Sequence, residues 1–142
     1  MKIFVTGVAG QLGHDVMNEL ASRGYVGVGT DLAESYSGIQ DDSYVTTAEY
    51  VSLDITNSEA VMNTIKTVNP DVVVHCAAWT AVDLAEDEDK QAKVKAINVD
   101  GTQNIADACK EVDAKMVLFL LIMYLMDKEL SLGNRIVRII SH

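Results

Sequence analysis

Short apolar runs alternate with longer amphipathic stretches along roughly the first 117 residues of the chain. An unbroken apolar run is typical of a strand that is buried on both faces, whereas apolar residues three or four apart are typical of a helix. Strands that alternate with helices predict an α/β fold, in which helices cover both faces of a parallel sheet. The predicted strands are Ile3–Thr6, Val26–Thr30, Tyr50–Leu53, Val72–Cys76 and Met116–Leu121.

Amphipathic helices are expected between these strands, and one of them has recognisable end signals. Thr56 and Glu59 have the spacing of a capping box, and Pro70 prevents the helix from continuing into the next strand. The segment Ala33–Ala48 lacks clear periodicity and is rich in Ser, Gly, Asp and Thr, so it is predicted to be a surface loop in place of a crossover helix. The predicted helices are Gln11–Arg23, Asn57–Val68 and Glu88–Val112.

Length and charge narrow the class of protein. A chain of 142 residues, 49% of them hydrophobic, suits one compact domain. Its net charge of -10 would repel nucleic acid, so small molecules or proteins are the expected partners. The longest apolar run, Met116–Met126, is much shorter than the roughly 20 residues of a membrane span. The N-terminus shows no leader, and Cys76 and Cys109 have no disulfide or metal-ligand spacing, so we expect two buried thiols in a cytoplasmic protein.

A glycine-rich segment, Thr6–Gly13, follows the first predicted strand and opens the first helix with the spacing GxxGxxG. Gly7 permits a tight turn, Gly10 lets the backbone approach a pyrophosphate, and Gly13 lets the helix pack closely on the strand. The helix N-terminus offers unpaired N–H groups and a positive dipole end to phosphates. Because a strand precedes the segment and a helix follows it, the pattern favours dinucleotide binding over an ordinary glycine-rich turn.

Acidic residues follow the next two predicted strands. Asp31 lies 18 residues after Gly13, where a carboxylate can accept hydrogen bonds from ribose hydroxyls and would repel a 2′-phosphate. This placement favours NADH over NADPH, and the alternative is a solvated aspartate in a turn. Asp54 and Ile55 follow the third strand, where a carboxylate can hold the edge of an adenine ring and an aliphatic side chain can cover its face.

Two later segments carry a family resemblance. The fourth strand runs into His75-Cys76-Ala77-Ala78-Trp79-Thr80-Ala81-Val82-Asp83-Leu84-Ala85-Glu86, and the last helix contains Ala96-Ile97-Asn98-Val99-Asp100-Gly101-Thr102. With the glycine segment, they resemble the dTDP-4-dehydrorhamnose reductases, which are extended short-chain dehydrogenases, over about Met1–Val117. The resemblance implies a Rossmann-type doubly wound parallel sheet, cut short after about the fifth strand. It also implies that the full-length parent reduces the C4 ketone of a dTDP-sugar substrate, dTDP-4-dehydro-L-rhamnose, with NAD(P)H.

The resemblance further implies roles for individual residues. Asn98 would help to order the site or would be an ordinary polar helix residue, and His75 is interpreted as structural because no second ligand lies at metal-binding spacing. The acidic stretch Asp83–Asp89 is interpreted as a solvated helix entrance, although the resemblance leaves room for Mg²⁺ at a subunit contact and for a homodimer. The cofactor would be lined by Gly10, Gln11, Leu12, Asp31, Asp54, Ile55, Ala77, Ala78, Trp79 and Thr80.

The chain departs from this family after the fifth strand. The family continues with STDYVFDG and later with Tyr-x-x-x-Lys, because a ketone reduction needs a tyrosine proton donor, a lysine that lowers the tyrosine pKa, and a hydroxyl group that orients the carbonyl. Tyr124 and Lys128 have the required spacing, but no Ser or Thr precedes them and no helix is expected to carry them. We interpret this spacing as coincidence, so no catalytic residue is assigned and the chain is expected to be inactive.

The last 24 residues can be encoded by codons whose neighbouring frame reads ISTDYVFDGQGTEPWEPDCKDYQP. This is the continuation that the family would have. The sequence therefore predicts an incomplete NAD(P)-binding domain over residues 1–117 and a frameshifted tail over residues 118–142, caused by loss of one nucleotide near Val117 and Leu118. Two alternatives stay open for the parent protein: another nucleotide-sugar epimerase or dehydratase, and a non-catalytic NAD(P)-binding regulatory subunit.

Overall fold

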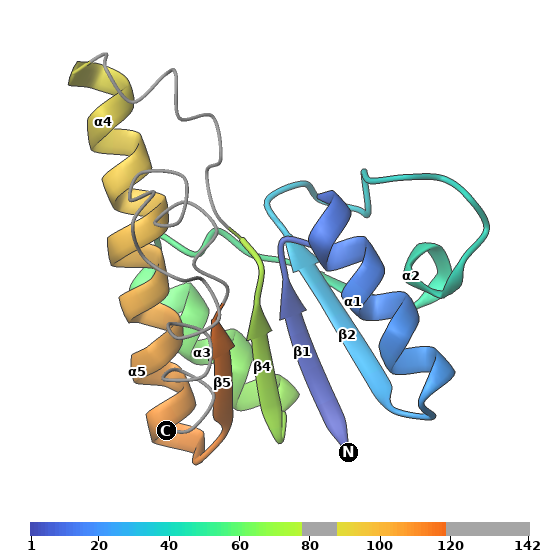
Figure 1. The fold of residues 1–142 in the computed structure, drawn as a ribbon. Helices are drawn as coiled ribbons and strands as arrows, with labels where there is room; N and C mark the ends of the chain where they lie inside the picture. Colours follow the sequence, from blue (N-terminus) through green and yellow to red (C-terminus); the bar gives the residue numbers. More distant parts are fainter. Residues whose placement is uncertain (78–87, 119–142) are drawn as a thin grey trace, which may run out of the picture.

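A parallel sheet of five strands forms the centre of the protein, as the computed structural model shows for the residues that it describes, 1–77 and 88–118. The strand order is β3-β2-β1-β4-β5, so the first strand lies in the middle and the chain runs outward from it in both directions (Figure 1). This is the predicted Rossmann-type arrangement. The strands are β1 (Lys2–Thr6), β2 (Val26–Asp31), β3 (Glu49–Ser52), β4 (Val72–His75) and β5 (Lys115–Leu118).

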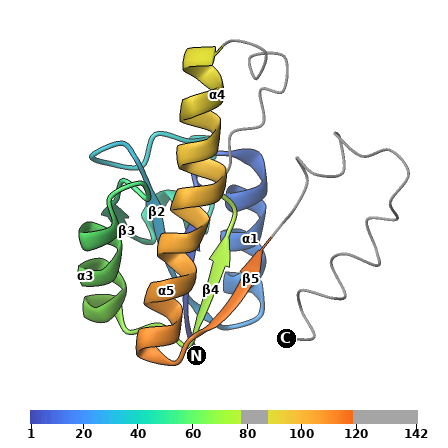
Figure 2. The same ribbon diagram turned by 90° about the vertical axis from the view of Figure 1, so that its left-hand side faces the viewer.

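Helices cover both faces of the sheet. The elements α1 and α2 lie on one face, and α3 and α5 lie on the other, as Figures 1 and 2 both show. A π-helical segment, η2, joins α4 to α5, and the three form one long rod whose α4 end projects past the carboxyl ends of the strands (Figure 2). The helical elements are α1 (Gln11–Ser22), α2 (Tyr44–Thr47), α3 (Ser58–Val68), α4 (Glu88–Lys95), η2 (Ala96–Gly101) and α5 (Thr102–Val112).

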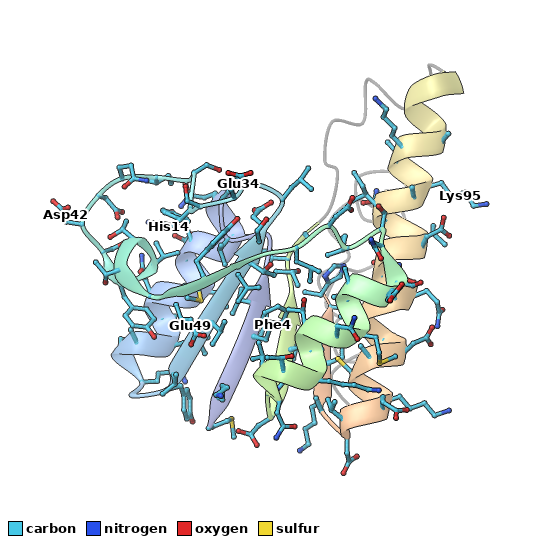
Figure 3. The ribbon with its side chains drawn as sticks, turned by 180° about the vertical axis from the view of Figure 1, so that it is seen from behind. Phe4, His14, Glu34, Asp42, Glu49 and Lys95 are labelled. Carbon is cyan, nitrogen blue, oxygen red and sulfur yellow. The ribbon has the colours of Figure 1, made fainter. Side chains whose placement is uncertain are left out.

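Two apolar cores fill the spaces between the sheet and its helices. Phe4 of β1 points toward α3 and α5 and is fully buried there (Figure 3). Its neighbours in the strand, Ile3 and Val5, point to the other face, where Met17 of α1 packs against the sheet. Because alternate residues of the strand enter different cores, Ile3, Phe4 and Val5 form an unbroken apolar run instead of alternating with polar residues.

The start of α3 differs from the prediction by one residue. Asn57 is the N-cap, because its side-chain oxygen accepts the backbone N–H of Ala60 at 3.0 Å. The hydroxyl of Thr56 instead donates to Asp54 Oδ1 at 2.7 Å. The predicted capping box of Thr56 and Glu59 was therefore wrong, since a side chain already bonded to Asp54 leaves the capping position to Asn57.

The predicted helix Glu88–Val112 is divided by the π-helical segment, and α2 interrupts the predicted loop Ala33–Ala48. Val45 of α2 is buried against α1, which explains why a short helix forms in an otherwise polar segment. The other observed helix and strand ends differ from the predicted ends by at most one residue. Residues 119–121 of the fifth predicted strand lie outside the described residues. No helix within residues 1–77 and 88–118 is long and apolar enough to cross a membrane.

Candidate functional site

The glycine turn between β1 and α1 lies at the carboxyl edge of the sheet, beside the end of β4. Gly7 has φ +74°, a conformation that side chains disfavour, and a Cβ atom there would lie 2.7 Å from the backbone nitrogen of Ala77. The Gly7 N–H donates to the carbonyl of Thr30 in β2 at 2.9 Å. The turn is therefore held between β2 and β4, and only glycine fits at its first position.

The other two glycines of the turn differ from each other. A Cβ atom at Gly13 would lie 2.3 Å from the carbonyl oxygen of Gly7, so this glycine lets α1 pack directly on the turn. A Cβ atom at Gly10 would meet only the same oxygen, at an ordinary 3.5 Å, because the space outside Gly10 is not filled by described residues. Gly10 is also the N-cap of α1, and within the described part no side chain caps this helix end. Its first N–H groups are thus available to an anion.

Asp31, at the end of β2, lies against the glycine turn. Its Oδ2 atom accepts the backbone N–H of Ala9 at 2.9 Å, and its Oδ1 atom accepts the N–H of Leu32 at 2.8 Å. A carboxylate oxygen can accept more than one hydrogen bond, so both oxygens keep capacity for hydroxyl donors. Asp31 therefore anchors the turn and also presents a carboxylate next to it.

The predicted adenine-binding residues follow β3, on the far side of β2. Asp54 is exposed, and its Oδ1 atom accepts both the N–H and the hydroxyl of Thr56. Ile55 is buried in the core between the sheet and the helices α3 and α5, with 9% of its surface exposed, and its side chain contacts the position of Gly101. The aliphatic surface that Ile55 offers to a ring is therefore small.

The remaining predicted cofactor-binding residues lie on α1 and after β4. Gln11 and Leu12 are exposed in the first turn of α1, where Gln11 Nε2 donates to Asp15 Oδ1 at 2.9 Å. Ala77 is half-buried beside Gly7. Ala78, Trp79 and Thr80 lie outside the described residues. The structure thus brings the ends of β1, β2 and β4 together around the glycine turn.

A polar cluster on α1 was missed by the sequence reasoning. His14 Nδ1 lies 3.0 Å from Asp15 Oδ1, and His14 Nε2 lies 2.7 Å from Asp41 Oδ2, in the loop that follows β2. Both ring nitrogens face carboxylates, and such neighbours favour the protonated, charged form of the ring. Figure 3 shows His14 on the side of the molecule where this loop, with Asp42, runs past α1.

Hydrogen bonds in this cluster shift the acid–base equilibria of its members. The bonds to Asp15 and Asp41 raise the pKa of His14, and the bonds from Ser43 and then His14 lower the pKa of Asp41 to about 2. The cluster fastens the loop to α1 one residue after the glycine segment. No sequence signal pointed to it, because His14 and Asp41 are 27 residues apart and the loop has no periodicity.

The cysteines and His75 occupy buried positions near the sheet. Cys76 and Cys109 are free, and burial raises the pKa of Cys76 to about 12 and that of Cys109 to about 11, so both remain unreactive thiols at neutral pH. His75 is 1% exposed and lies between two threonine hydroxyls. Asn98 lies in η2. Among the described residues, no group of three or more His, Cys, Asp or Glu side chains is arranged to hold a metal ion.

Comparison with known proteins identifies the family. A family model described as the RmlD substrate binding domain matches residues 1–119. The chain belongs to this family. Among RmlD-type relatives, the dTDP-4-dehydrorhamnose reductase of Streptomyces griseus is 36% identical over 113 residues, which are 80% of this chain and 31% of the relative. The chain thus spans about a third of the length of the curated relatives that it matches.

Solved structures of a reductase and of an epimerase are similar to this chain. The dTDP-4-dehydrorhamnose reductase of Bacillus anthracis, solved in complex with NADP, is 31% identical with a TM-score of 0.62 over 81% of this chain and 34% of that one. The UDP-glucose 4-epimerase of Brucella ovis, solved in complex with NAD, is 28% identical with a TM-score of 0.67 over 82% of this chain and 34% of that one. The similarity to the RmlD family ends at residue 119, one residue after β5.

Proposed function

We propose that residues 1–117 are the NAD(P)H-binding part of a reductase that converts dTDP-4-dehydro-L-rhamnose to dTDP-L-rhamnose. The observation that carries the proposal is the glycine turn, in which an open space outside Gly10 lies at an uncapped helix N-terminus. The family match and the reductase relatives supply the reaction. We place this function in the cytoplasm, because both cysteines are free thiols.

The residues around the turn fit a dinucleotide. The first N–H groups of α1 can bind a pyrophosphate, and the absence of a side chain at Gly10 lets it approach the backbone. When bound, the reduced nicotinamide supplies a hydride to the ketone carbon. We assign no proton donor in this chain, because Tyr124 and Lys128 lie outside the described residues and have no Ser or Thr before them. The chain is thus proposed to bind cofactor without turnover.

A preference for NADH forms part of this proposal. The carboxylate of Asp31 lies beside the glycine turn, where it can accept hydrogen bonds from the two hydroxyls of the adenosine ribose of NADH and would repel the 2′-phosphate of NADPH. The Ala9 and Leu32 N–H groups occupy one position on each carboxylate oxygen, and each oxygen keeps capacity for a ribose hydroxyl. The expected preference therefore combines these hydrogen bonds with repulsion of the phosphate.

A frameshift is our proposal for the tail. The family match ends at residue 119, and the alternative reading frame that contains STDYVFDG begins at the same place. The parent gene would then encode the catalytic residues and the sugar-binding part in the restored frame. An NAD-dependent nucleotide-sugar epimerase is a second candidate, favoured by the similarity to the Brucella ovis enzyme. Assays of the frame-restored protein with both substrates would distinguish the two reactions.

The binding proposal is tested by titrating NADH fluorescence with the 142-residue chain and with Gly10→Val. The branched side chain would occupy the space in which a pyrophosphate meets the backbone, so we expect NADH binding to be lost. Gly24→Asn is the matched control, since Gly24 has open space around it, lies at the opposite end of α1, and has a φ of +78° that asparagine tolerates. NADH affinity retained in Gly10→Val would mean that the segment is only a turn.

A further inference from the structure

A buried hydroxyl group joins the glycine turn to the end of β4. Thr6 is fully buried, and its Oγ1 atom accepts the backbone N–H groups of Cys76 and Ala77 at 3.1 Å each. The Cys76 N–H also reaches the Thr6 carbonyl oxygen at 3.3 Å. The third neighbour of Oγ1 is the Nδ1 atom of His75, at 2.7 Å.

The direction of each hydrogen bond follows from the hydroxyl group. A threonine hydroxyl has one hydrogen to donate and two lone pairs that accept. The two backbone N–H groups use both lone pairs, so the hydroxyl hydrogen must go to His75 Nδ1. An Nδ1–H group would be a third donor to an oxygen with no free lone pair. Nδ1 is therefore unprotonated.

The other nitrogen of the ring then carries the hydrogen and extends the network. His75 Nε2 lies 3.1 Å from Thr102 Oγ1, at the first residue of α5, and donates to it. The ring is neutral, since its burial lowers the pKa of His75 to about 4. A single tautomer thus links β1, β4 and α5 through Thr6 and Thr102.

This network acts where two cofactor-binding segments meet. The backbone of Ala77 approaches the glycine turn so closely that a Cβ atom on Gly7 would lie 2.7 Å from its nitrogen. The Ala77 N–H is held by Thr6, and the Thr6 hydroxyl is in turn held by His75. Loss of the His75 ring would leave the buried Thr6 hydroxyl without an acceptor, next to the close backbone contact between Gly7 and Ala77.

We propose that His75, as the neutral Nε2–H tautomer, is a positioning residue that fixes the carboxyl end of β4 against the glycine turn. The consequence for NADH rests on the proposed function. With His75 in place, the distance between the Ala77 backbone and the glycine turn at Gly7 is already fixed before the cofactor binds. A pre-arranged site of this kind binds more tightly than one that must be ordered on binding.

The first test is made on the 142-residue chain without cofactor. Nitrogen-15 NMR of the His75 ring should show protonated Nε2 and unprotonated Nδ1, unchanged between about pH 5.5 and 8. The Nδ1–H tautomer, or a ring that titrates in this range, would overturn the proposal. This measurement does not depend on any NADH binding.

The second test compares His75→Leu with His75→Asn. Leucine provides no acceptor for Thr6, whereas the side-chain oxygen of asparagine can take the place of Nδ1. We expect amide exchange at Cys76 and Ala77 to be about tenfold faster in His75→Leu and close to wild type in His75→Asn. NADH affinity should fall about tenfold in His75→Leu and by no more than about twofold in His75→Asn. Should His75→Leu not fold, Thr102→Val breaks the other bond of the ring and should still speed this exchange about threefold.

The outcomes separate the two proposals. If the wild-type chain does not bind NADH, the proposed function fails, and the exchange rates alone decide the role of His75. If the wild-type chain binds NADH but folded His75→Leu keeps both its affinity and its exchange rates, the role of His75 is overturned and the proposed function stands. Unchanged exchange in Thr102→Val would count equally against the network.

Discussion

Two glycines of the turn should differ in their roles, because Gly10 is expected to be needed for cofactor binding and Gly13 for stability of the fold. In Gly13→Ala, the added Cβ would lie 2.3 Å from the Gly7 carbonyl oxygen and 2.7 Å from Val8 Cα, both backbone atoms. Overpacking usually costs about 1–3 kcal/mol, and backbone neighbours cannot rotate away, so we expect about 3 kcal/mol. For a chain of this size, the melting temperature should fall by about 10 °C.

Gly10→Ala is the matched variant. Its added Cβ would lie 3.5 Å from the nearest atom, and Gly10 already has φ −85°, which alanine adopts without strain. Reduced freedom of the unfolded chain opposes the poorer N-cap, so stability should stay within about 1 kcal/mol of wild type. NADH affinity should nevertheless fall at least about tenfold, because the methyl group lies where a pyrophosphate approaches.

Thermal unfolding followed by circular dichroism, together with NADH fluorescence titration, measures both effects. A melting temperature of Gly13→Ala within about 2 °C of wild type would refute the packing argument. Wild-type NADH affinity in Gly10→Ala would refute the assignment of the open space to a pyrophosphate. The two substitutions add the same methyl group to the same turn. A general effect of alanine therefore cannot explain a loss of stability in Gly13→Ala together with a loss of NADH affinity at near-normal stability in Gly10→Ala.

Three further predictions follow from the carboxylates and the tail. Asp31→Ala should weaken binding of both cofactors by loosening the turn, but the ratio of NADH to NADPH affinity should fall; an unchanged ratio in fluorescence titration would remove Asp31 from cofactor selection. The hydrogen bonds that raise the pKa of His14 stabilise the loop fully below pH 6.5, the ordinary pKa of histidine, and this stabilisation is lost as the pH rises through the raised pKa. The hydrogen bonds that lower the pKa of Asp41 stabilise the loop above pH 3.8, the ordinary pKa of aspartate, and this stabilisation is lost as the pH falls toward about 2. Amide protection at Val45 should thus be greatest between about pH 4 and 6.5. His14→Gln should lose the decline above pH 6.5 but keep the decline toward acid, because the Ser43 bonds to Asp41 remain, and a wild-type profile without the decline above pH 6.5 would contradict the cluster. Resequencing the coding DNA near Val117 should reveal one missing nucleotide, and an intact reading frame there would contradict the frameshift.

Local patterns in the sequence were sufficient to predict the fold and the glycine turn. Ile3, Phe4 and Val5 of β1 form an unbroken apolar run because Phe4 enters one core and its two neighbours enter the other, and this run is visible without a structure. The roles of Gly7 and Gly13 also follow from spacing, since a strand, a turn and a helix must meet within eight residues. Both positions prove to be in backbone contact, at Ala77 and within the turn itself.

Features that depend on partners far apart in the chain could not be predicted in this way. The raised pKa of His14 depends on Asp15 and on Asp41, which belongs to a loop without periodicity, and the tautomer of His75 depends on Thr6, 69 residues earlier. The N-cap of α3 was predicted one residue too early because the Thr56 hydroxyl had a competing acceptor in Asp54. In each case, the sequence shows the groups but not which of several partners lies within reach.

The central position of β1 has a consequence for the order of folding during synthesis. Its first neighbour, β2, begins at Val26, but its second neighbour pairs Ile3 with Val72, so one side of the strand stays open until β4 has been made. At about 5–20 residues per second, that interval lasts several seconds on the ribosome. The glycine turn can therefore contact β2 first, whereas the Ala77 backbone becomes available to its other side only after roughly half of the chain has emerged.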